Sequence, residues 1–370
     1  MKYYDYAATS PVDEDILETF VNVTQDFIAH PNTDKKAIKL RAEAKESILK
    51  ALGIENKELV FTSGGTEANN LAIFGVANSF ESKKHFITSS YEHSSVYESF
   101  KELEKRGHEV TYVVPQKNGK INFEDVIKEI KKDTVMVSLM SVNNEIGTVN
   151  DIDLIGRKIK AVSKDIIFMV DHVQGFGKVH NLDYDNIDIL IISSHKVYGP
   201  KACGVIIKNK DIKLTKMIYG GQGENGMRSG SQSLASEVAF AKAINKTIKE
   251  MDNNISKIRK NIKLLESLLC ENELININIE PEANILSINV KIEMMGESLL
   301  SVFHEEGIFI STKSACSKKL NVANRSLDAI GLSKEQMDRT FRISIGKNTE
   351  EKDIIELAEK VIEIIKYFGS

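Results

Sequence analysis

The sequence predicts an α/β protein: a large domain with a mostly parallel seven-stranded sheet, and a smaller α+β domain. Three observations support this prediction. Short apolar runs alternate with segments of helical spacing over much of the chain. One run, residues 187–192, is almost continuously apolar, as expected for a strand covered on both faces. Beyond a glycine-rich stretch at residues 220–230, the pattern changes to long helical segments rich in lysine and glutamate.

Seven apolar runs are predicted to form the large sheet. Segments between them carry apolar residues at helical spacing, such as Ile152, Ile155 and Ile159, and are predicted to cover the sheet. The predicted strands are Leu59–Thr62, His85–Ser89, Val110–Val114, Val135–Met140, Ile166–Val170, Ile187–Ser193 and Gly204–Ile207.

The smaller domain is predicted from the C-terminal third of the chain. A long helix over Ser233–Leu269 is expected to join it to the large domain, since no proline-rich linker separates them. A last helix places Ile354, Ala358 and Val361 on one apolar stripe. The predicted strands here are Asn284–Val290, Ile308–Ser311 and Thr340–Ser344. We therefore expect a large domain of residues 14–258, and a small domain of residues 1–13 and 259–370.

Length, charge and cysteine content limit the possible functions. A chain of 370 residues accommodates two domains. The net charge of -4 gives no electrostatic reason to expect direct nucleic-acid binding. Three cysteines without a C-x-x-C pair argue against a disulfide framework or a zinc site. Neither a signal-peptide core nor a bilayer-length apolar run is found, so we expect a cytoplasmic protein without membrane contact.

A glycine-containing segment, residues 62–70, follows one predicted strand and opens a helix. Gly64 and Gly65 allow a tight turn with exposed N–H groups, and Thr66 is suited to cap the helix and donate its hydroxyl. Such a helix start binds phosphate groups readily. A capped turn without a ligand is the alternative interpretation.

An acid and an amine follow two other predicted strands. Asp171 lies at the end of one strand, and Lys196 comes shortly after the next. In an open α/β sheet ligands bind at these strand ends. A buried carboxylate there needs a cationic partner, and a desolvated lysine is suited to covalent chemistry with carbonyl groups. Taken singly, a capping aspartate and a solvated lysine are the commoner cases. Together with the phosphate-type turn, the pair matches what pyridoxal phosphate (PLP) requires from a protein.

Three further residues are candidates for chemistry. His93 follows a predicted strand and is suited to stacking or proton transfer, although an incidental histidine near a helix cap is an equal alternative. Cys316 lies among small and basic residues that favour a thiolate, whereas Cys203 and Cys270 are interpreted as structural. Arg342, in a strand of the smaller domain, is suited to bind a carboxylate, with a surface ion pair as the alternative.

Two apparent motifs are rejected. Residues 221–226 fit G-x-G-x-x-G, but they follow no convincing strand. Asp171, His172 and His195 do not have the spacing of a zinc site, so no metal is expected.

Taken together, these segments resemble the cysteine desulfurases of the NifS/IscS-like branch of fold-type I PLP enzymes. The resemblance extends from residues 4–9, YDYAAT, to residues 342–346, RISIG, and so covers nearly the whole chain. Between these ends the family's motifs occur in order: TSGGTEANN, SVNNEIGT, VDHVQ, SSHKVYGPK, ENGMRSGS and SAC.

The resemblance implies a role for each matching residue. Lys196 would carry PLP covalently, and Asp171 would pair with the pyridine nitrogen. Gln174 would contact the ring hydroxyl, and His93 would stack over the ring and help to move protons. Cys316, on a loop that moves between the active site and the acceptor, would be the nucleophile.

The remaining implied contacts concern the phosphate and the substrate. The residues implied for the phosphate are Gly65, Thr66, Ser193 and His195, with Ser231 reaching the phosphate of a partner subunit. Arg342 and Asn144 would bind the substrate carboxylate.

The resemblance implies that L-cysteine is converted to L-alanine, with its sulfur held as a persulfide on Cys316. A homodimer is implied, as is an acceptor protein in iron–sulfur assembly or tRNA thiolation, either a scaffold or a tRNA sulfurtransferase. Lys313 and Asn225 depart from the family pattern, where glycine and arginine are common. The alternatives are another fold-type I PLP enzyme, such as an aminotransferase or selenocysteine lyase, and a catalytically silent sulfur carrier.

Overall fold

A seven-stranded sheet forms the centre of the computed structural model, which describes residues 2–28, 34–312 and 324–369. Its strand order is β2-β8-β7-β6-β5-β3-β4. The pairs from β7 through β6, β5 and β3 to β4 are parallel, and β8 runs antiparallel to both of its neighbours. The strands are β2 (Lys57–Thr62), β3 (His85–Ser89), β4 (Glu109–Val113), β5 (Thr134–Met140), β6 (Ile167–Asp171), β7 (Ile189–Ser193) and β8 (Gly204–Asn209). The prediction of a mostly parallel seven-stranded sheet is confirmed.

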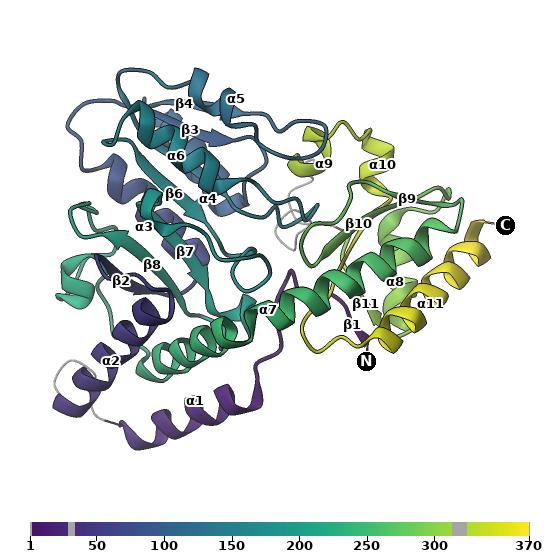
Figure 1. The fold of residues 1–370 in the computed structure, drawn as a ribbon, viewed down its shortest axis with the longest axis horizontal. Coiled ribbons are helices and arrows are strands. Elements are labelled where there is room, and N and C mark those ends of the chain that lie inside the picture. Colours follow the sequence, from purple (N-terminus) through teal and green to yellow (C-terminus); the bar gives the residue numbers. More distant parts are fainter. Residues whose placement is uncertain (1, 29–33, 313–323, 370) are drawn as a thin grey trace.

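Helices cover both faces of this sheet because its central strands are apolar on both sides (Figure 1). Along β7, Ile189 and Ile191 pack in a cluster with α3 and α4, whereas Leu190 and Ile192 pack in a cluster with α2 and α6. This alternation follows from the two-residue repeat of a strand. The covering helices are α2 (Lys35–Ala51), α3 (Gly65–Ala77), α4 (Ser94–Lys105), α5 (Phe123–Lys128) and α6 (Ile152–Val162).

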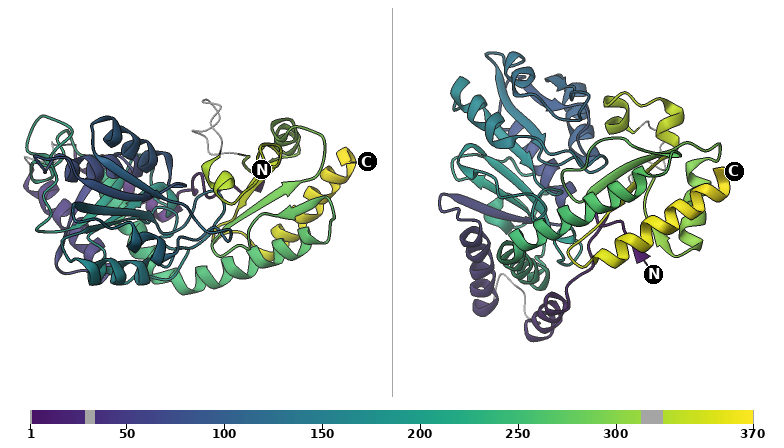
Figure 2. Two further views of the ribbon diagram at one scale, coloured as in Figure 1. Left: turned by 90° about the horizontal axis from the view of Figure 1, so that it is seen from above. Right: turned by 45° about the vertical axis from the view of Figure 1, so that its right-hand side comes forward.

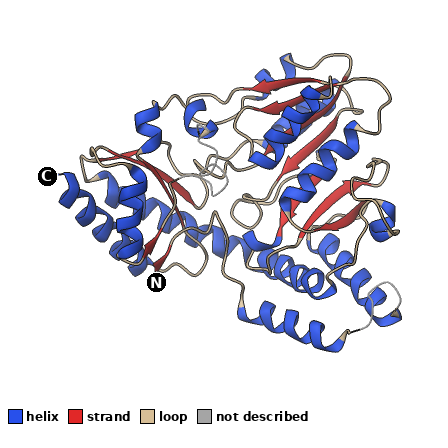
Figure 3. Ribbon diagram, turned by 180° about the vertical axis from the view of Figure 1, so that it is seen from behind, coloured by secondary structure: helices blue, strands red, loops and turns tan. Residues whose placement is uncertain are grey.

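A second hydrophobic core surrounds a three-stranded antiparallel sheet of order β12-β10-β9. Its strands are β9 (Ile275–Ile277), β10 (Ile285–Val290) and β12 (Thr340–Ser344), and the helices packed with them are α8 (Gly296–Glu305) and α11 (Glu351–Gly369) (Figure 3). The N-terminal strand β1 (Lys2–Tyr3) pairs in parallel with β11 (Ile308–Phe309). The first residues of the chain therefore lie with its C-terminal third.

A single 37-residue helix, α7 (Leu234–Cys270), joins the two parts, as predicted (Figures 1 and 2). Phe240 and Ile244 pack in the large core, and Ile262 and Leu265 pack in the small one. The core that α7 contacts therefore changes between Ile244 and Ile262, and the domain boundary at residue 258 stays a prediction. No helix in the part of the chain that the structure describes is long and apolar enough to span a membrane.

Several helices were not predicted from the sequence. One is α1 (Glu14–Asp26), which packs along α7. Two short helices, α9 (Arg325–Ala329) and α10 (Lys334–Asp338), lie between the two parts of the molecule (Figure 1). Leu327 of α9 packs into the core of the large sheet, although its neighbours in sequence belong to the smaller unit.

Candidate active site

A cleft of about 440 Å³ opens at the carboxyl ends of the parallel strands. The lining includes most of the predicted site residues, namely Gly65, Thr66, His93, Asn144, Asp171, Gln174, Ser193, His195, Lys196 and Arg342. Ser231 is exposed and does not line this cleft, so its predicted reach into a partner subunit stays a prediction. Cys316 lies outside the described residues.

One end of the cleft is the turn between β2 and α3. Gly64 has a φ of 146°, which strongly favours glycine, and it holds the cap position of α3 without any side-chain cap. Thr66 therefore does not cap the helix, contrary to our prediction, and lies in the first turn instead. A Cβ on Gly65 would lie 3.2 Å from Cγ2 of Val173. The first residues of this 13-residue helix line the cleft, and a helix start without a side-chain cap is suited to bind an anion.

We expect Gly204→Ala to disturb this turn without touching the catalytic side chains. A Cβ at residue 204 would lie 2.7 Å from the backbone carbon of Gly64, which no side-chain rotation can relieve. The variant should lose about 1–3 kcal/mol of unfolding free energy, measured in urea, and bind a phosphate-bearing ligand more weakly. Gly221→Ala is the matched control, because nothing lies within 4 Å of its Cβ. Equal losses of unfolding free energy and of ligand affinity in the two variants would contradict this prediction.

A buried carboxylate forms one side of the cleft. Asp171 ends β6, and its Oδ1 accepts the backbone N–H of Val173 at 3.0 Å. Its Oδ2 accepts the side-chain amide of Asn69 at 2.8 Å. The same Asn69 amide donates to Oγ of Ser95 at 2.9 Å, so both of its hydrogens are used. These donors fix the direction of the Asp171 side chain.

His93 caps helix α4 and also lines the cleft, and its role in stacking or proton transfer stays a prediction. Its Nδ1 accepts the backbone N–H of Ser95 at 3.2 Å and lies 2.8 Å from the Ser95 hydroxyl. Burial lowers the pKa of His93, although the negative charge of Asp171 opposes this. The neutral ring therefore carries its proton on Nε2, since Nδ1 is an acceptor.

Lys196 follows β7 in the short 3₁₀ helix Ser194–Lys196, as predicted from its strand-end position. Its Nζ donates to the backbone carbonyl of Ala8 at 2.8 Å and also to that of Ala7. Burial lowers the pKa of Lys196 to about 8, and the positive charge of Arg342 acts in the same direction. The amine is thus available as a nucleophile near neutral pH.

The lowered pKa of Lys196 predicts how the amine responds to pH. Because a group with a pKa near 8 is half neutral at pH 8, its reaction with a carbonyl reagent should rise about fivefold from pH 7 to 8 and level off above pH 9. We would measure aldehyde incorporation at Lys196 by peptide mass analysis. The free amino acid derivative Nα-acetyl-lysine serves as the control, because the rate of an ordinary lysine amine should rise through pH 10. A Lys196 profile parallel to that control would contradict this prediction.

Three more predicted residues complete this side of the cleft. The Ser193 hydroxyl lies 2.9 Å from Nδ1 of His195, and burial lowers the pKa of His195 to about 3, so this ring is neutral. Gln174 donates its side-chain amide to the carbonyl of Ala7 at 2.8 Å. The buried Oε1 of Gln174 has no hydrogen-bond partner within the described chain. It is therefore free to accept a hydroxyl from a ligand.

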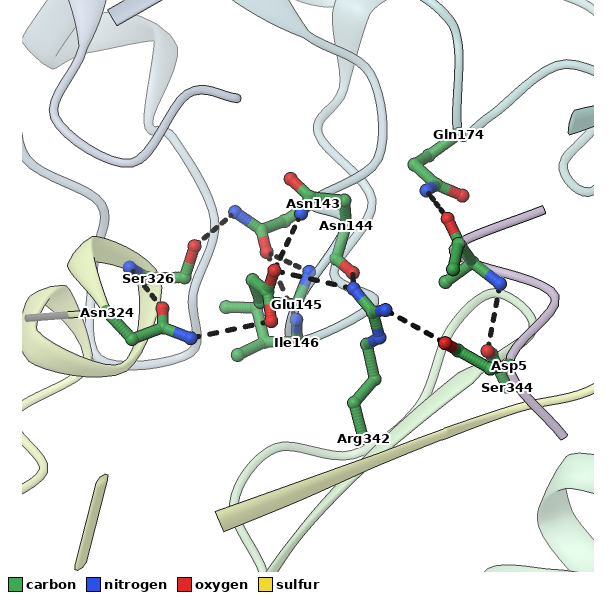
Figure 4. A network of polar contacts seen from close by, with 12 residues as sticks. Asp5, Asn143, Asn144, Glu145, Ile146, Gln174, Asn324, Ser326, Arg342 and Ser344 are labelled. Carbon is green, nitrogen blue, oxygen red and sulfur yellow. Dashed lines mark hydrogen bonds and ion pairs between the residues drawn. The ribbon is translucent and has the colours of Figure 1, made fainter. Parts of the chain in front are cut away.

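Arg342 projects from β12 of the smaller sheet to the other end of the cleft (Figure 4). It is only 4% exposed, so the surface ion pair that we considered as an alternative is wrong. Its guanidinium donates to Asp5 at 2.9 Å, to the carbonyl of Asn144 at 2.8 Å and to Glu145 at 3.4 Å. Neither acid was predicted as a site residue, although Glu145 directly follows the predicted Asn144.

The two described cysteines differ. Cys203 is buried, and burial raises the pKa of its thiol, so its structural assignment is confirmed. Cys270 is exposed at the end of α7, so the structural assignment of this residue is wrong. The rejected G-x-G-x-x-G segment includes the short 3₁₀ helix Gly223–Gly226, not the turn of a βαβ unit.

Comparison with known proteins gives one consistent family. The model of the aminotransferase class-V family matches residues 2–357. The cysteine desulfurase IscS of Dictyoglomus turgidum is 35% identical over 98% of this chain and 95% of its own length. The cysteine desulfurase IscS of Pectobacterium carotovorum is 36% identical over 97% of this chain and 92% of its own length.

Solved structures agree with these relatives. A NifS-like protein superposes with a TM-score of 0.91 at 29% identity, over 99% of this chain and 100% of its own. SspA in complex with cysteine superposes with a TM-score of 0.81 at 32% identity, over 95% of this chain and all of its own.

Proposed function

The chain belongs to the class-V aminotransferases and, within them, to the cysteine desulfurases, and from this membership we propose that it transfers sulfur from L-cysteine to Cys316. The observation that carries this proposal is that three ionisable side chains line one strand-end cleft: the Lys196 amine, the Asp171 carboxylate and the Arg342 guanidinium. An amine, an acid and a carboxylate-binding cation are what a PLP enzyme acting on an amino acid needs.

The described residues fit PLP, the cofactor of this family. The turn at Gly64–Thr66 suits its phosphate, and the unpartnered Oε1 of Gln174 suits its ring hydroxyl. Asp171, oriented by two donors, suits the protonated ring nitrogen. When bound, PLP acts as an electron sink that stabilises negative charge at the substrate α-carbon.

Side chains of this protein bind the substrate and move its protons. We assign the substrate carboxylate to Arg342 and Asn144. The neutral amine of Lys196 removes the α-proton, for which its lowered pKa is suited. His93 lines the cleft and helps to move protons there, with Nδ1 as an acceptor and the ring proton on Nε2.

The sulfur step balances without an oxidant. The thiolate of Cys316 attacks the substrate sulfur, the carbon–sulfur bond breaks, and the carbon gains a proton. L-Cysteine and one enzyme thiol thus become L-alanine and one persulfide.

The partners follow from the same proposal. We propose a homodimer, supported by the exposed apolar side chains of Met217, Ile218 and Tyr219 close in sequence to Ser231. We propose further that a cytoplasmic acceptor protein, either an iron–sulfur scaffold or a tRNA sulfurtransferase, collects the sulfur.

Mass analysis of Cys316 tests the proposal. After incubation with L-cysteine, the peptide that carries Cys316 should gain one sulfur atom, and L-alanine should appear in the solution. The peptide that carries Cys270 is the internal control, because this cysteine is exposed but lies outside the cleft. Pyruvate or keto-acid products without alanine would favour an aminotransferase instead.

A further inference from the structure

Arg342 is already neutralised by acids of this chain, and these come from two separate segments. Asp5 belongs to the N-terminal segment next to β1, and Glu145 belongs to the loop after β5 (Figure 4). The Arg342 side chain is 5% exposed, and those of Asp5 and Glu145 are 19% and 8% exposed. Water therefore screens this group of charges only weakly.

Both acids are held in place by further contacts. The carboxylate of Glu145 accepts the side-chain amide of Asn144 at 2.9 Å and that of Asn324, the cap residue of α9, at 3.4 Å. Burial raises the pKa of Glu145, whereas the positive charge of Arg342 opposes this and favours the ion. The Nε of Arg342 is buried and has no partner within the described chain. The Nε–H thus remains available on a guanidinium that already has two anionic neighbours.

This arrangement has a consequence for any ligand that brings a carboxylate to Arg342. The negative charge of the ligand approaches a guanidinium whose positive charge is already balanced by Asp5 and Glu145. Both carboxylates repel the ligand, because water screens this site only weakly. An α-amino acid brings an ammonium group as well, so it adds no net charge. A simple carboxylate lacks this compensation.

We propose that Asp5 and Glu145 determine specificity through Arg342, by selecting α-amino acid zwitterions over simple carboxylates. The inference rests on the proposed function, in which Arg342 binds the substrate carboxylate. Asp5 and Glu145 would act on the substrate through the Arg342 guanidinium, and the ligands that they exclude are simple carboxylates.

The test uses a pair of probes that differ only in charge. Calorimetry of the PLP-loaded chain would measure the affinity for 3-mercaptopropionate, which is cysteine without its amino group, and for the corresponding uncharged amide. Glu145→Gln and Asp5→Asn each remove one negative charge with little change in shape. We expect each variant to bind the carboxylate at least about tenfold more tightly, because this factor, about 1.4 kcal/mol, is a low value for a like-charge contact in a weakly screened site. The affinity for the amide should stay constant.

Two controls separate the possible outcomes. Glu282→Gln removes an acid that pairs with Lys120 outside the cleft, and it should change neither affinity. Arg342→Ala should weaken binding of the carboxylate; if it does not, the proposed role of Arg342 itself fails. If Arg342→Ala weakens binding but neither acid variant tightens it, or if the amide shifts equally, only the specificity inference is overturned.

Discussion

Lys196→Ala should lower L-alanine formation from L-cysteine by at least about 10⁴-fold, the upper range for a single proton-transfer group. The expected loss is large because this amine has two tasks, as covalent carrier of the cofactor and as base at the substrate α-carbon. The carbonyls of Ala7 and Ala8 hold Nζ in place for both tasks. Steady-state alanine production, with absorbance to follow bound PLP, measures both effects.

Lys164→Ala is the control for Lys196→Ala, because Lys164 is exposed and lies outside the cleft. After borohydride treatment, the unaltered chain and this control should keep a cofactor adduct that survives denaturation, whereas Lys196→Ala should release it. Retained activity in Lys196→Ala would remove the basis of the proposed mechanism.

The sheet was predictable because its strands are apolar on both faces and are separated by helices of clear periodicity. The residues that were missed lack such a signal. Helix α1 packs on α7, more than 200 residues away in sequence. The small apolar cluster at this contact includes Ile16 and Phe20 of α1 and Val12, which precedes the helix. The short helix α9 is defined by the cap residue Asn324 and one buried leucine, Leu327. Local sequence does not distinguish such elements from loops.

The site residues likewise include some that the sequence predicts and some that it does not. Asp171 and Lys196 were predictable, because polar residues that directly follow buried strands meet at one edge of a parallel sheet. The carbonyls of Ala7 and Ala8 were not, because backbone acceptors have no sequence signature and lie 189 and 188 positions from Lys196. Asn69 could have been suspected from the sequence, because it is a polar residue among the mostly apolar buried residues of its helix. Asp5 and Glu145 could be recognised as site residues only from the structure, in which both contact Arg342.

Cys316→Ala should reduce sulfur transfer by at least about 10³-fold while leaving the cofactor site intact. The physical reason is that the thiolate accepts the sulfur, whereas the described cleft residues bind and activate the substrate. The variant should therefore bind PLP as tightly as the unaltered chain and still change its absorbance when L-cysteine is added. A loss of the Lys196 amine would remove both responses, so the two variants divide the reaction into an activation step and a transfer step.

Cys270→Ala is the matched control for this variant, because Cys270 is an exposed thiol outside the cleft. It should transfer sulfur at the unaltered rate. Cys203→Ala is a poorer control, since Cys203 is buried in the large core and its loss should lower stability. If Cys316→Ala kept full sulfur release from L-cysteine, the chain would be a PLP enzyme that frees sulfide directly. The Lys196, Asp171 and Arg342 assignments would then survive, because each depends on the cleft and none depends on a persulfide.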